Sequence, residues 1–293
     1  MCTGAMSQDF TLTAKDGAAI AATVFRPQGD GIPVVIQSAT AVPRGYYAKF
    51  ARHLAEHGFL VVTFDYRGIG GSRGPGSLRH LEGGTSAWAQ LDAGAAHAWI
   101  REATGRPRAL VVGHSIGGQI VGLLPEPQHV AGVLGVAAQS GYWRLWTGAR
   151  RLQMFVYMHA LLPLVANALG HVPGWMGIGE DLPRSAALEW ARWCRTPGYL
   201  LGDDPRRHEP YARVVGPVLG YSFADDSYAP HANVATWLRF FPSASIEHRH
   251  VEPAQLGVKA IGHFGFFRQS FESTLWADAR AWLLEHAHRT ARP

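Results

Sequence analysis

The stretch "LVVGHSIGGQIVG", Leu110–Gly122, places a serine between glycines where an apolar run gives way to a segment of helical character. Gly113, Ser115 and Gly117 fit the pattern Gly-x-Ser-x-Gly, which needs a strand before it and a helix after it. A serine in so sharp a turn takes an unfavourable backbone conformation, and side chains two residues to either side would collide. The stretch therefore predicts a strand–helix turn that presents Ser115. A turn that is merely rich in small residues would fit the same five positions.

Short apolar runs without alternation occur on both sides of this turn and are typical of strands covered by helices on both faces. A segment of helical spacing, residues 44–58, separates the first two runs, and this order predicts parallel crossovers. Before them, Asp16-Gly17 and the alternation that follows predict an antiparallel hairpin. The runs are "IPVVIQSA" (32–39), "FLVVTFD" (59–65), "RALVVGHS" (108–115) and "VAGVLGVAAQ" (130–139).

The regular pattern stops after Gln139. Residues 140–215 show no strand pattern but hold helical stretches such as "ARRLQMFVYMHALLPLVANALG" and "SAALEWARWC". Strand character returns at 216–226 and 244–251, and a helix closes the chain. We therefore predict a core formed by residues 1–139 and 216–293, with a helical cap, or lid, inserted at 140–215. Five tryptophans lie in this segment, and there are two interpretations of them: they line an apolar pocket, or they form the core of the cap itself. They are Trp143, Trp146, Trp175, Trp190 and Trp193.

A serine hydroxyl is a weak nucleophile without a base, and the base needs an acid that fixes its tautomer. His263 lies in "KAIGHFGFF", a loop between the last strand and the last helix. His114 is adjacent to Ser115 but points to the opposite face of an extended segment. Asp225 and Asp226 end a predicted strand, where a helix cap is the alternative interpretation. The order serine, acid, histidine along a parallel sheet is typical of a catalytic triad.

These features together resemble the α/β-hydrolase superfamily over nearly the whole chain. The shared features are an antiparallel pair, the nucleophile elbow "GHSIGG", an acid after the next-to-last strand, a histidine before the last helix and a helical cap. The resemblance implies an α/β fold with a mostly parallel central sheet flanked by helices. "FDYRGIGGS" (64–72) is similar to a family loop in which Asp65 and Arg67 have a structural role. "DYRGIG", "SGYWRLW" and "WARWCRTPGYL" resemble a group of bacterial members whose substrates are unassigned.

By position, the resemblance implies that Ser115 is the nucleophile and His263 the general base. It favours Asp226 over Asp225 as the acid, because "DSYAP" is similar to the family's acid followed four residues later by proline. The expected activity is that of a serine hydrolase that cleaves a carboxylic ester of a small or medium-sized substrate through an acyl-enzyme. A thioesterase, an acyltransferase, a carbon–carbon bond hydrolase or a non-catalytic binding protein of the same fold remain as alternatives.

The oxyanion hole should combine the backbone N–H of Ile116 with an N–H from the loop after "VVIQS". In register this second donor is Thr40, and Ala41 is the weaker alternative. The His-Gly-x of the family is replaced here by Ser38-Ala39-Thr40, so the resemblance does not determine the path of this loop.

Composition excludes several other classes of protein. The net charge is +5, but the lysines and arginines are scattered, so no nucleic-acid surface is expected. Two cysteines, Cys2 and Cys194, make neither a disulfide framework nor a metal knuckle. The histidines of "EHRH" (247–250) lack an evident third ligand, so we expect no metal, and no cofactor motif is present.

The sequence predicts a cytoplasmic protein with a small-molecule acyl substrate and no membrane partner. The first residues lack the pattern of a signal peptide, and we expect no apolar run long enough to span a bilayer. Oligomeric state is left open between monomer and homo-oligomer. Arginines of the predicted cap are expected to be solvated at the surface, with an anchor for an acidic substrate as the alternative; they are Arg144, Arg150, Arg151, Arg192 and Arg195.

Overall fold

An eight-stranded sheet lies at the centre of the computed structural model, which describes residues 6–177, 179–202 and 204–291. The strands run in the order β1-β2-β4-β3-β5-β6-β9-β10, and all pairs from β4 onward are parallel. β1 pairs antiparallel with β2, and β2 with β4. The predicted mostly parallel sheet with an antiparallel start is confirmed. The strands are β1 (Met6–Thr13), β2 (Ala19–Arg26), β3 (Ile32–Gln37), β4 (Phe59–Phe64), β5 (Ala109–His114), β6 (Val130–Val136), β9 (Val218–Phe223) and β10 (Ile246–Val251).

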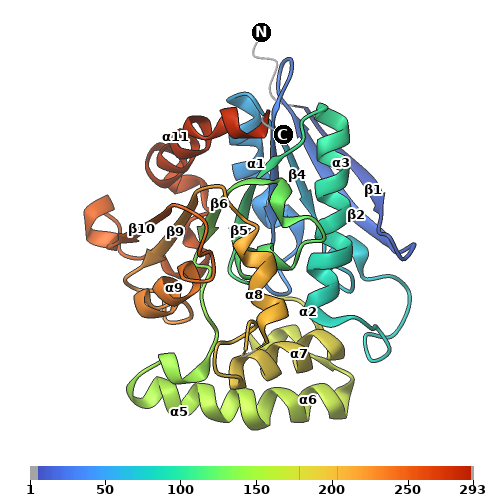
Figure 1. Cartoon of the computed structure of the whole chain (residues 1–293). Coiled ribbons are helices and arrows are strands. Elements are labelled where there is room, and N and C mark those ends of the chain that lie inside the picture. Colours follow the sequence, from blue (N-terminus) through green and yellow to red (C-terminus); the bar gives the residue numbers. More distant parts are fainter. Residues whose placement is uncertain (1–5, 178, 203, 292–293) are drawn as a thin grey trace.

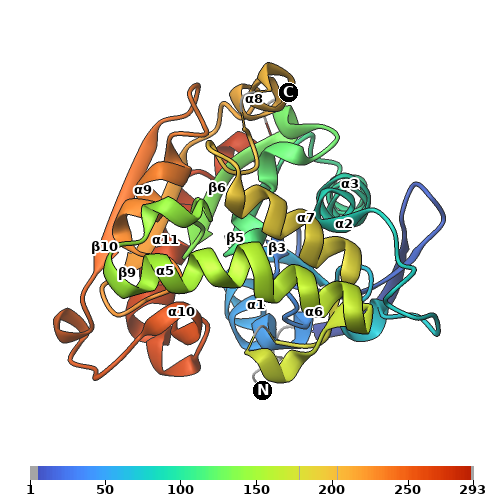
Figure 2. The same ribbon diagram turned by 90° about the horizontal axis from the view of Figure 1, so that it is seen from below.

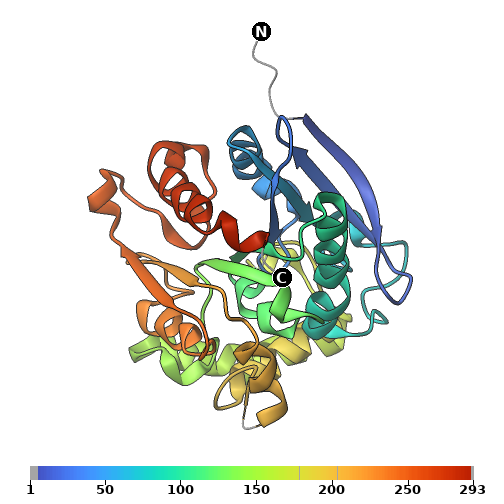
Figure 3. The same cartoon turned by 45° about the horizontal axis from the view of Figure 1, so that its top comes forward.

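Helices cover both faces of the sheet (Figures 1 and 3). α1 (Ala48–Glu56) and α11 (Ala277–Glu285) lie on one face, and α3 (Gly94–Thr104) and α9 (His231–Leu238) on the other. This explains the continuous apolar runs, because every residue of β4, β5, β6 and β9 is buried. The short helices α2 (Gly84–Ala87), α4 (Ile116–Gln119) and α10 (Gly262–Gly265) lie in the connections.

The described residues of the predicted cap segment form four α-helices: α5 (Gly148–Val156), α6 (Leu162–Leu169), α7 (Arg184–Arg195) and α8 (Pro205–Ala212). Of these, α5, α6 and α7 gather beyond one end of the sheet, at the bottom of Figure 1 and face-on in Figure 2, while α8 lies apart from them. A π-helical turn, Tyr157–Leu161, joins α5 to α6. The expectation of no strand in this segment is wrong, because β7 (His171–Val172) and β8 (Leu182–Pro183) form a short antiparallel pair. The boundaries at residues 140 and 215 stay a prediction.

The continuous helix from α5 to α6 is more apolar than the sequence pattern indicated. Gly148–Leu169 spans 22 residues with a mean hydropathy of 1.5, which is enough to cross a bilayer by length and composition. The expectation that no apolar run reaches this length is therefore wrong. Within this helix, only 22% of the apolar 18-residue window is buried inside the protein, so much of the helix surface is left uncovered.

Candidate active site

Ser115 lies at the sharp turn between β5 and α4, with a backbone φ of 51° and ψ of −118°. Such a left-handed φ is unfavourable for a residue with a side chain, and it turns Ser115 out of the strand. The flanking glycines permit the turn, because a Cβ on Gly113 would lie 2.4 Å from Gly118 Cα and one on Gly117 would lie 2.3 Å from the Gln37 carbonyl oxygen. The predicted collision is thus confirmed. α4 is a single turn of four residues and therefore has no large helix dipole. Any positive potential that it provides near Ser115 comes from its first N–H groups.

The structure brings His263 and Asp226 together. His263 Nδ1 lies 2.7 Å from Asp226 Oδ2, although 37 residues separate the two. The other carboxylate oxygen, Oδ1, accepts hydrogen bonds from the backbone N–H groups of Tyr228 at 2.8 Å and Ala229 at 3.0 Å. The Asp226 side chain is fully buried. These bonds hold the carboxylate in one orientation, so His263 donates from Nδ1 and presents Nε2 as an acceptor.

Asp225, the alternative acid, has a different set of partners. Its carboxylate accepts hydrogen bonds from the backbone N–H of Ile261 at 2.8 Å and of Gly262 at 3.0 Å. It therefore fixes the loop that carries His263 but does not contact the imidazole. The two adjacent carboxylates therefore have different roles: Asp226 contacts the His263 ring, and Asp225 contacts the backbone of the same loop.

His114 connects two loops behind the site. The Tyr47 hydroxyl accepts from the Ala39 N–H at 2.8 Å and lies 2.8 Å from His114 Nδ1, so it donates its proton there. His114 Nε2 lies 2.9 Å from the His263 carbonyl oxygen, to which it must donate. Burial lowers the pKa of His114 well below its usual value, so the ring stays neutral. No hydrogen bond joins His114 to the Ser115 side chain among the described residues, and the contacts of His114 tie the Ala39 loop to the His263 loop.

The predicted oxyanion donors are the backbone N–H groups of Thr40 and Ile116. Neither the Thr40 N–H nor the Ile116 N–H donates a hydrogen bond to another described residue. The Ala41 N–H also lacks such a partner, but Ala41 is fully buried and does not line the cavity beside Ser115. Thr40 does line it. A donor role for Thr40 and Ile116 stays a prediction.

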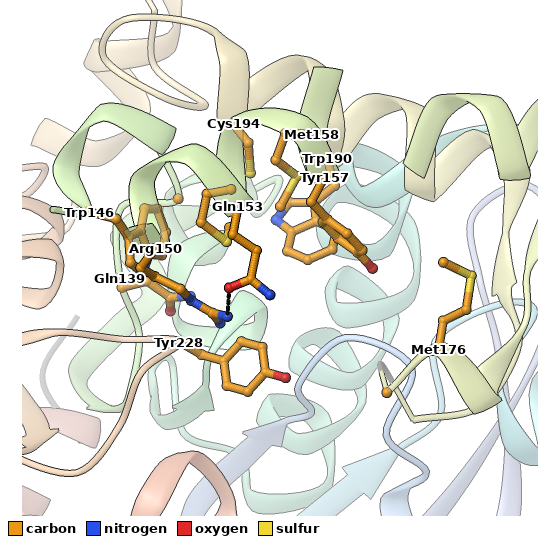
Figure 4. A pocket seen from close by; sticks show the side chains of 13 residues that line it. Gln139, Trp146, Arg150, Gln153, Tyr157, Met158, Met176, Trp190, Cys194 and Tyr228 are labelled. Atoms are coloured by element: carbon orange, nitrogen blue, oxygen red, sulfur yellow. Dashed lines mark hydrogen bonds between the residues drawn. The ribbon is translucent and has the colours of Figure 1, made fainter. Parts of the chain in front are cut away.

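Ser115 and His263 line one small cavity of about 60 Å³. No hydrogen bond joins the Ser115 hydroxyl to His263 among the described residues, and such bonds often form only when substrate is bound. A second cavity of about 180 Å³ adjoins it (Figure 4). The two cavities are neighbours, because four residues line both of them: Gln139, Gly177, Trp190 and Tyr228.

Some tryptophans of the cap segment line a cavity, and others are buried in the core or lie at the surface. Trp146 and Trp190 line the larger cavity, whereas Trp193 is buried in the core. Trp143 packs against Phe155, and Trp175 is exposed. No local pattern in the sequence distinguishes these positions.

One arginine departs from the expected surface position. Arg150 lines the larger cavity with its guanidinium above the Tyr228 ring, 5.2 Å from the ring centre. Arg144 and Arg151 are exposed, and Arg192 pairs with Glu189 at 3.2 Å on the surface. Sequence reasoning preferred the solvated interpretation for all five arginines; Arg150 is only partly exposed and lines the cavity, so for this residue the alternative, an anchor for an acidic substrate, stays open.

The glycine-rich loop after β4 has the structural role expected from the resemblance. Asp65 is fully buried and accepts hydrogen bonds from the N–H groups of Arg44 at 2.6 Å and Gly71 at 2.9 Å. Arg67 bonds Asp92 at 2.7 and 2.8 Å and Asp16 at 2.7 Å. None of these side chains lines the cavity beside Ser115.

The histidines of "EHRH" contact a serine and another histidine. His248 and His250 each have a ring nitrogen 2.8 Å from Ser222 Oγ, and His231 stacks on His248. No group of three or more metal-ligating side chains with the geometry of a metal site occurs among residues 6–177, 179–202 and 204–291.

Comparison with known proteins is consistent with this fold. A family model described as alpha/beta hydrolase fold matches residues 33–161. Comparison with curated protein sequences gives no match.

Solved structures of esterases share the fold over nearly the whole chain. A thermophilic esterase from Thermogutta terrifontis is 17% identical, with a TM-score of 0.59, over 96% of this chain and 99% of that one. A Pyrococcus furiosus esterase is 15% identical, with a TM-score of 0.60, over 97% and 92%. Brefeldin A esterase, a bacterial homologue of human hormone sensitive lipase, is 18% identical, with a TM-score of 0.58, over 98% and 80%. The sheet order, the turn at Ser115 and these comparisons show that the chain has the α/β-hydrolase fold.

Proposed function

We propose that this chain is a serine hydrolase that cleaves a carboxylic ester through an acyl-enzyme intermediate. The observation that carries the proposal is the hydrogen bond of 2.7 Å between the buried Asp226 and His263 beside the cavity that Ser115 lines. A carboxylate in that position sets the imidazole tautomer that a serine nucleophile requires. Esterase neighbours of the same fold support the proposal.

In the proposed reaction, His263 Nε2 takes the proton of the Ser115 hydroxyl as its oxygen attacks the ester carbonyl. The N–H groups of Ile116 and Thr40 stabilise the oxyanion, and each such donor contributes about 3 kcal/mol in related chemistry. His263 then gives the proton to the leaving alcohol, and an acyl group remains on Ser115. A water molecule activated by His263 attacks this acyl group and releases the acid.

Labelling with a fluorophosphonate tests the nucleophile. We expect a covalent adduct on Ser115, located by peptide mass spectrometry, and no adduct in the Ser115→Ala variant. Labelling of another residue, or none in the folded protein, would contradict the proposal.

Turnover of 4-nitrophenyl esters tests whether the residues act as a unit. Ser115→Ala should lower kcat/KM by about 10⁴-fold or more, and adding His263→Ala should cost little further because each residue depends on the other. If instead the double variant loses the product of the two single-variant factors in kcat/KM, His263 is not the base of Ser115. Matched thioesters and oxygen esters of several chain lengths then separate an esterase from a thioesterase.

A further inference from the structure

We infer that the cavity beside Ser115 binds substrates that carry a carboxylate, with Arg150 as the residue that recognises it. This inference rests on the proposed function, since it names the substrate class of the same site. Arg150 lies on α5, and its side chain enters the larger cavity between Gln153 and Tyr228 (Figure 4).

The guanidinium of Arg150 is held in place but lacks an anionic partner. Its Nη1 donates to Gln153 Oε1 at 2.7 Å, and the group lies over the Tyr228 ring. Its Nη2 makes no hydrogen bond to a described residue, and no described carboxylate forms an ion pair with the group. A guanidinium without an anionic partner at a cavity wall favours a ligand that supplies a carboxylate.

The rest of the cavity wall is uncharged. None of the lining residues is acidic, and burial raises the pKa of the Cys194 thiol, which therefore stays protonated. Arg150 is thus the charged group among the described residues of the wall. Apolar lining comes from methionine and aromatic side chains: Trp146, Met154, Tyr157, Met158, Met176 and Trp190.

A second donor lies at the junction of the two cavities. Tyr199 donates to Gln119 Oε1 at 2.6 Å, and Gln119 Nε2 donates to Gln139 Oε1 at 2.9 Å. This chain fixes the orientation of the Gln139 amide and leaves its Nε2 without a partner among the described residues. Gln139 lines both cavities. Two groups that offer N–H donors favour a ligand rich in acceptor oxygens.

The Tyr228 ring packs against both Arg150 and His263 and so limits the distance between them. Its ring centre is 5.2 Å from the Arg150 guanidinium carbon and 5.4 Å from the His263 ring centre. The guanidinium is therefore at most about 11 Å from His263. A carboxylate separated from the ester carbonyl by a short apolar chain or a ring fits this distance, as in a monoester of a dicarboxylic acid.

Paired ester series test the inference. One series consists of 4-nitrophenyl monoesters of succinic to suberic acid, which carry the carboxylate on the acyl part, and is compared with 4-nitrophenyl alkanoates of equal chain length. A second series places the carboxylate on the alcohol part. The measured quantity is the ratio of kcat/KM for each anionic ester to that of its neutral match.

We expect Arg150→Gln to lower this ratio by about 10- to 100-fold in one of the two series, as expected for the loss of a charge-assisted hydrogen bond. Arg150→Lys should retain part of it, because it keeps the charge without the planar fork. The control, Arg144→Gln, removes the same charge from an exposed position over Trp143 and should leave the ratio unchanged.

The outcomes separate the two levels of the proposal. If neutral esters are hydrolysed but Arg150→Gln changes neither ratio, the inference is wrong and the esterase proposal stands. If no ester of either series is hydrolysed and Ser115 is not labelled, the proposed function itself fails. In that case calorimetry with adipate still decides the inference, since binding that Arg150→Gln abolishes would support it and absence of binding would overturn it.

A different observation carries a second inference: we propose that the outer face of α5 and α6 docks on an anionic lipid surface. The inward positions recur every fourth residue, and Met154, Met158, Leu162 and Ala166 are buried. The outward positions of the same helix carry apolar side chains that nothing described covers: Leu152, Phe155, Val156, Leu161, Leu164 and Leu169. Leu164 is 68% exposed and Leu152 65%.

Charge favours a lipid surface over a second copy of the chain. No aspartate or glutamate occurs between Glu126 and Glu180, so this segment carries only positive formal charge. Arg144 and Arg151 are exposed around the start of the helix. Two such faces would repel one another, whereas an anionic bilayer attracts them, and an apolar helix face with basic flanks is typical of helices that lie in the membrane interface. α5 and α6 run across the surface seen in Figure 2, where a planar partner can reach both.

Vesicle co-sedimentation tests this docking. The intact protein should sediment with vesicles of phosphatidylcholine and phosphatidylglycerol, less with phosphatidylcholine alone, and less at high salt. Leu152→Glu combined with Leu164→Glu should abolish sedimentation at unchanged circular dichroism, and Leu152→Ser with Leu164→Ser should weaken it. The control, Ile246→Glu, adds a charge at an apolar position that is 45% exposed on β10 and should sediment like the unaltered protein.

Light scattering of the same proteins tests the alternative that a second copy of the chain covers this helix face. A monomer that binds anionic vesicles supports the proposal. A dimer that the double variant dissociates would overturn it in favour of self-association, and a monomer that binds neither kind of vesicle would also overturn it.

Discussion

Replacing Asp226 with asparagine should invert the tautomer of His263. The oxygen Oδ1 of Asp226 accepts two backbone N–H groups, from Tyr228 at 2.8 Å and Ala229 at 3.0 Å, and these N–H groups still require an acceptor in the variant. The asparagine oxygen must therefore stay there, which directs its N–H₂ group toward His263 Nδ1, 2.7 Å from the present Oδ2. An amide donor needs Nδ1 as an acceptor, so the ring proton moves to Nε2.

A protonated Nε2 cannot take the proton of Ser115. We expect kcat to fall by about 10⁴-fold, the size of effect that the wrong tautomer has in serine hydrolases, which corresponds to roughly 5.5 kcal/mol in the activation free energy. The assay is the hydrolysis of a 4-nitrophenyl ester at pH 8, together with the imidazole nitrogen chemical shifts of His263, which report the tautomer directly.

Asp225→Asn is the matched control for this change. It alters the neighbouring carboxylate, which holds the backbone N–H groups of Ile261 and Gly262 but does not touch the imidazole. We expect it to lower the unfolding free energy by about 1–3 kcal/mol and to stay far more active than Asp226→Asn. The reasoning is refuted if Asp226→Asn keeps a tenth of the activity, or if Asp225→Asn is the more damaging change.

Two further predictions concern stability. Gly117→Ala places a methyl group 2.3 Å from the Gln37 carbonyl oxygen, so its unfolding free energy in urea should fall by about 1–3 kcal/mol, whereas Gly76→Ala, with nothing within 4 Å, should be close to neutral. Burial lowers the pKa of His97 to about 3. The stability that this neutral ring contributes is complete above about pH 6.5 and is lost as the pH falls toward 3, by about 1.4 kcal/mol per pH unit. His97→Gln should make the pH dependence shallower by that amount between pH 6 and 4; an unchanged slope would show that His97 is already charged.

Local patterns were sufficient to predict the fold, and together with the family resemblance they gave candidate positions for the site. Apolar runs, the glycines around Ser115 and the order of Ser115, Asp226 and His263 all follow from rules that act over a few residues or along the chain. A strand that is covered on both faces must be apolar throughout, and a turn as tight as that at Ser115 requires glycine two residues to either side. For these reasons the sheet and the elbow could be predicted without a tertiary structure.

Contacts between distant segments decided what those patterns left open. Asp225 and Asp226 are adjacent, and only the position of the loop 36 or 37 residues away determines which of them meets the ring of His263. Arg150 and Arg151 are equally basic neighbours on one helix, yet a rotation of about 100° per residue turns Arg150 into the cavity and leaves Arg151 outside. The sequence by itself determined the fold and the candidate positions of the site along the chain; the tertiary structure decided which side chains meet there, because a side chain's direction depends on what packs against its element.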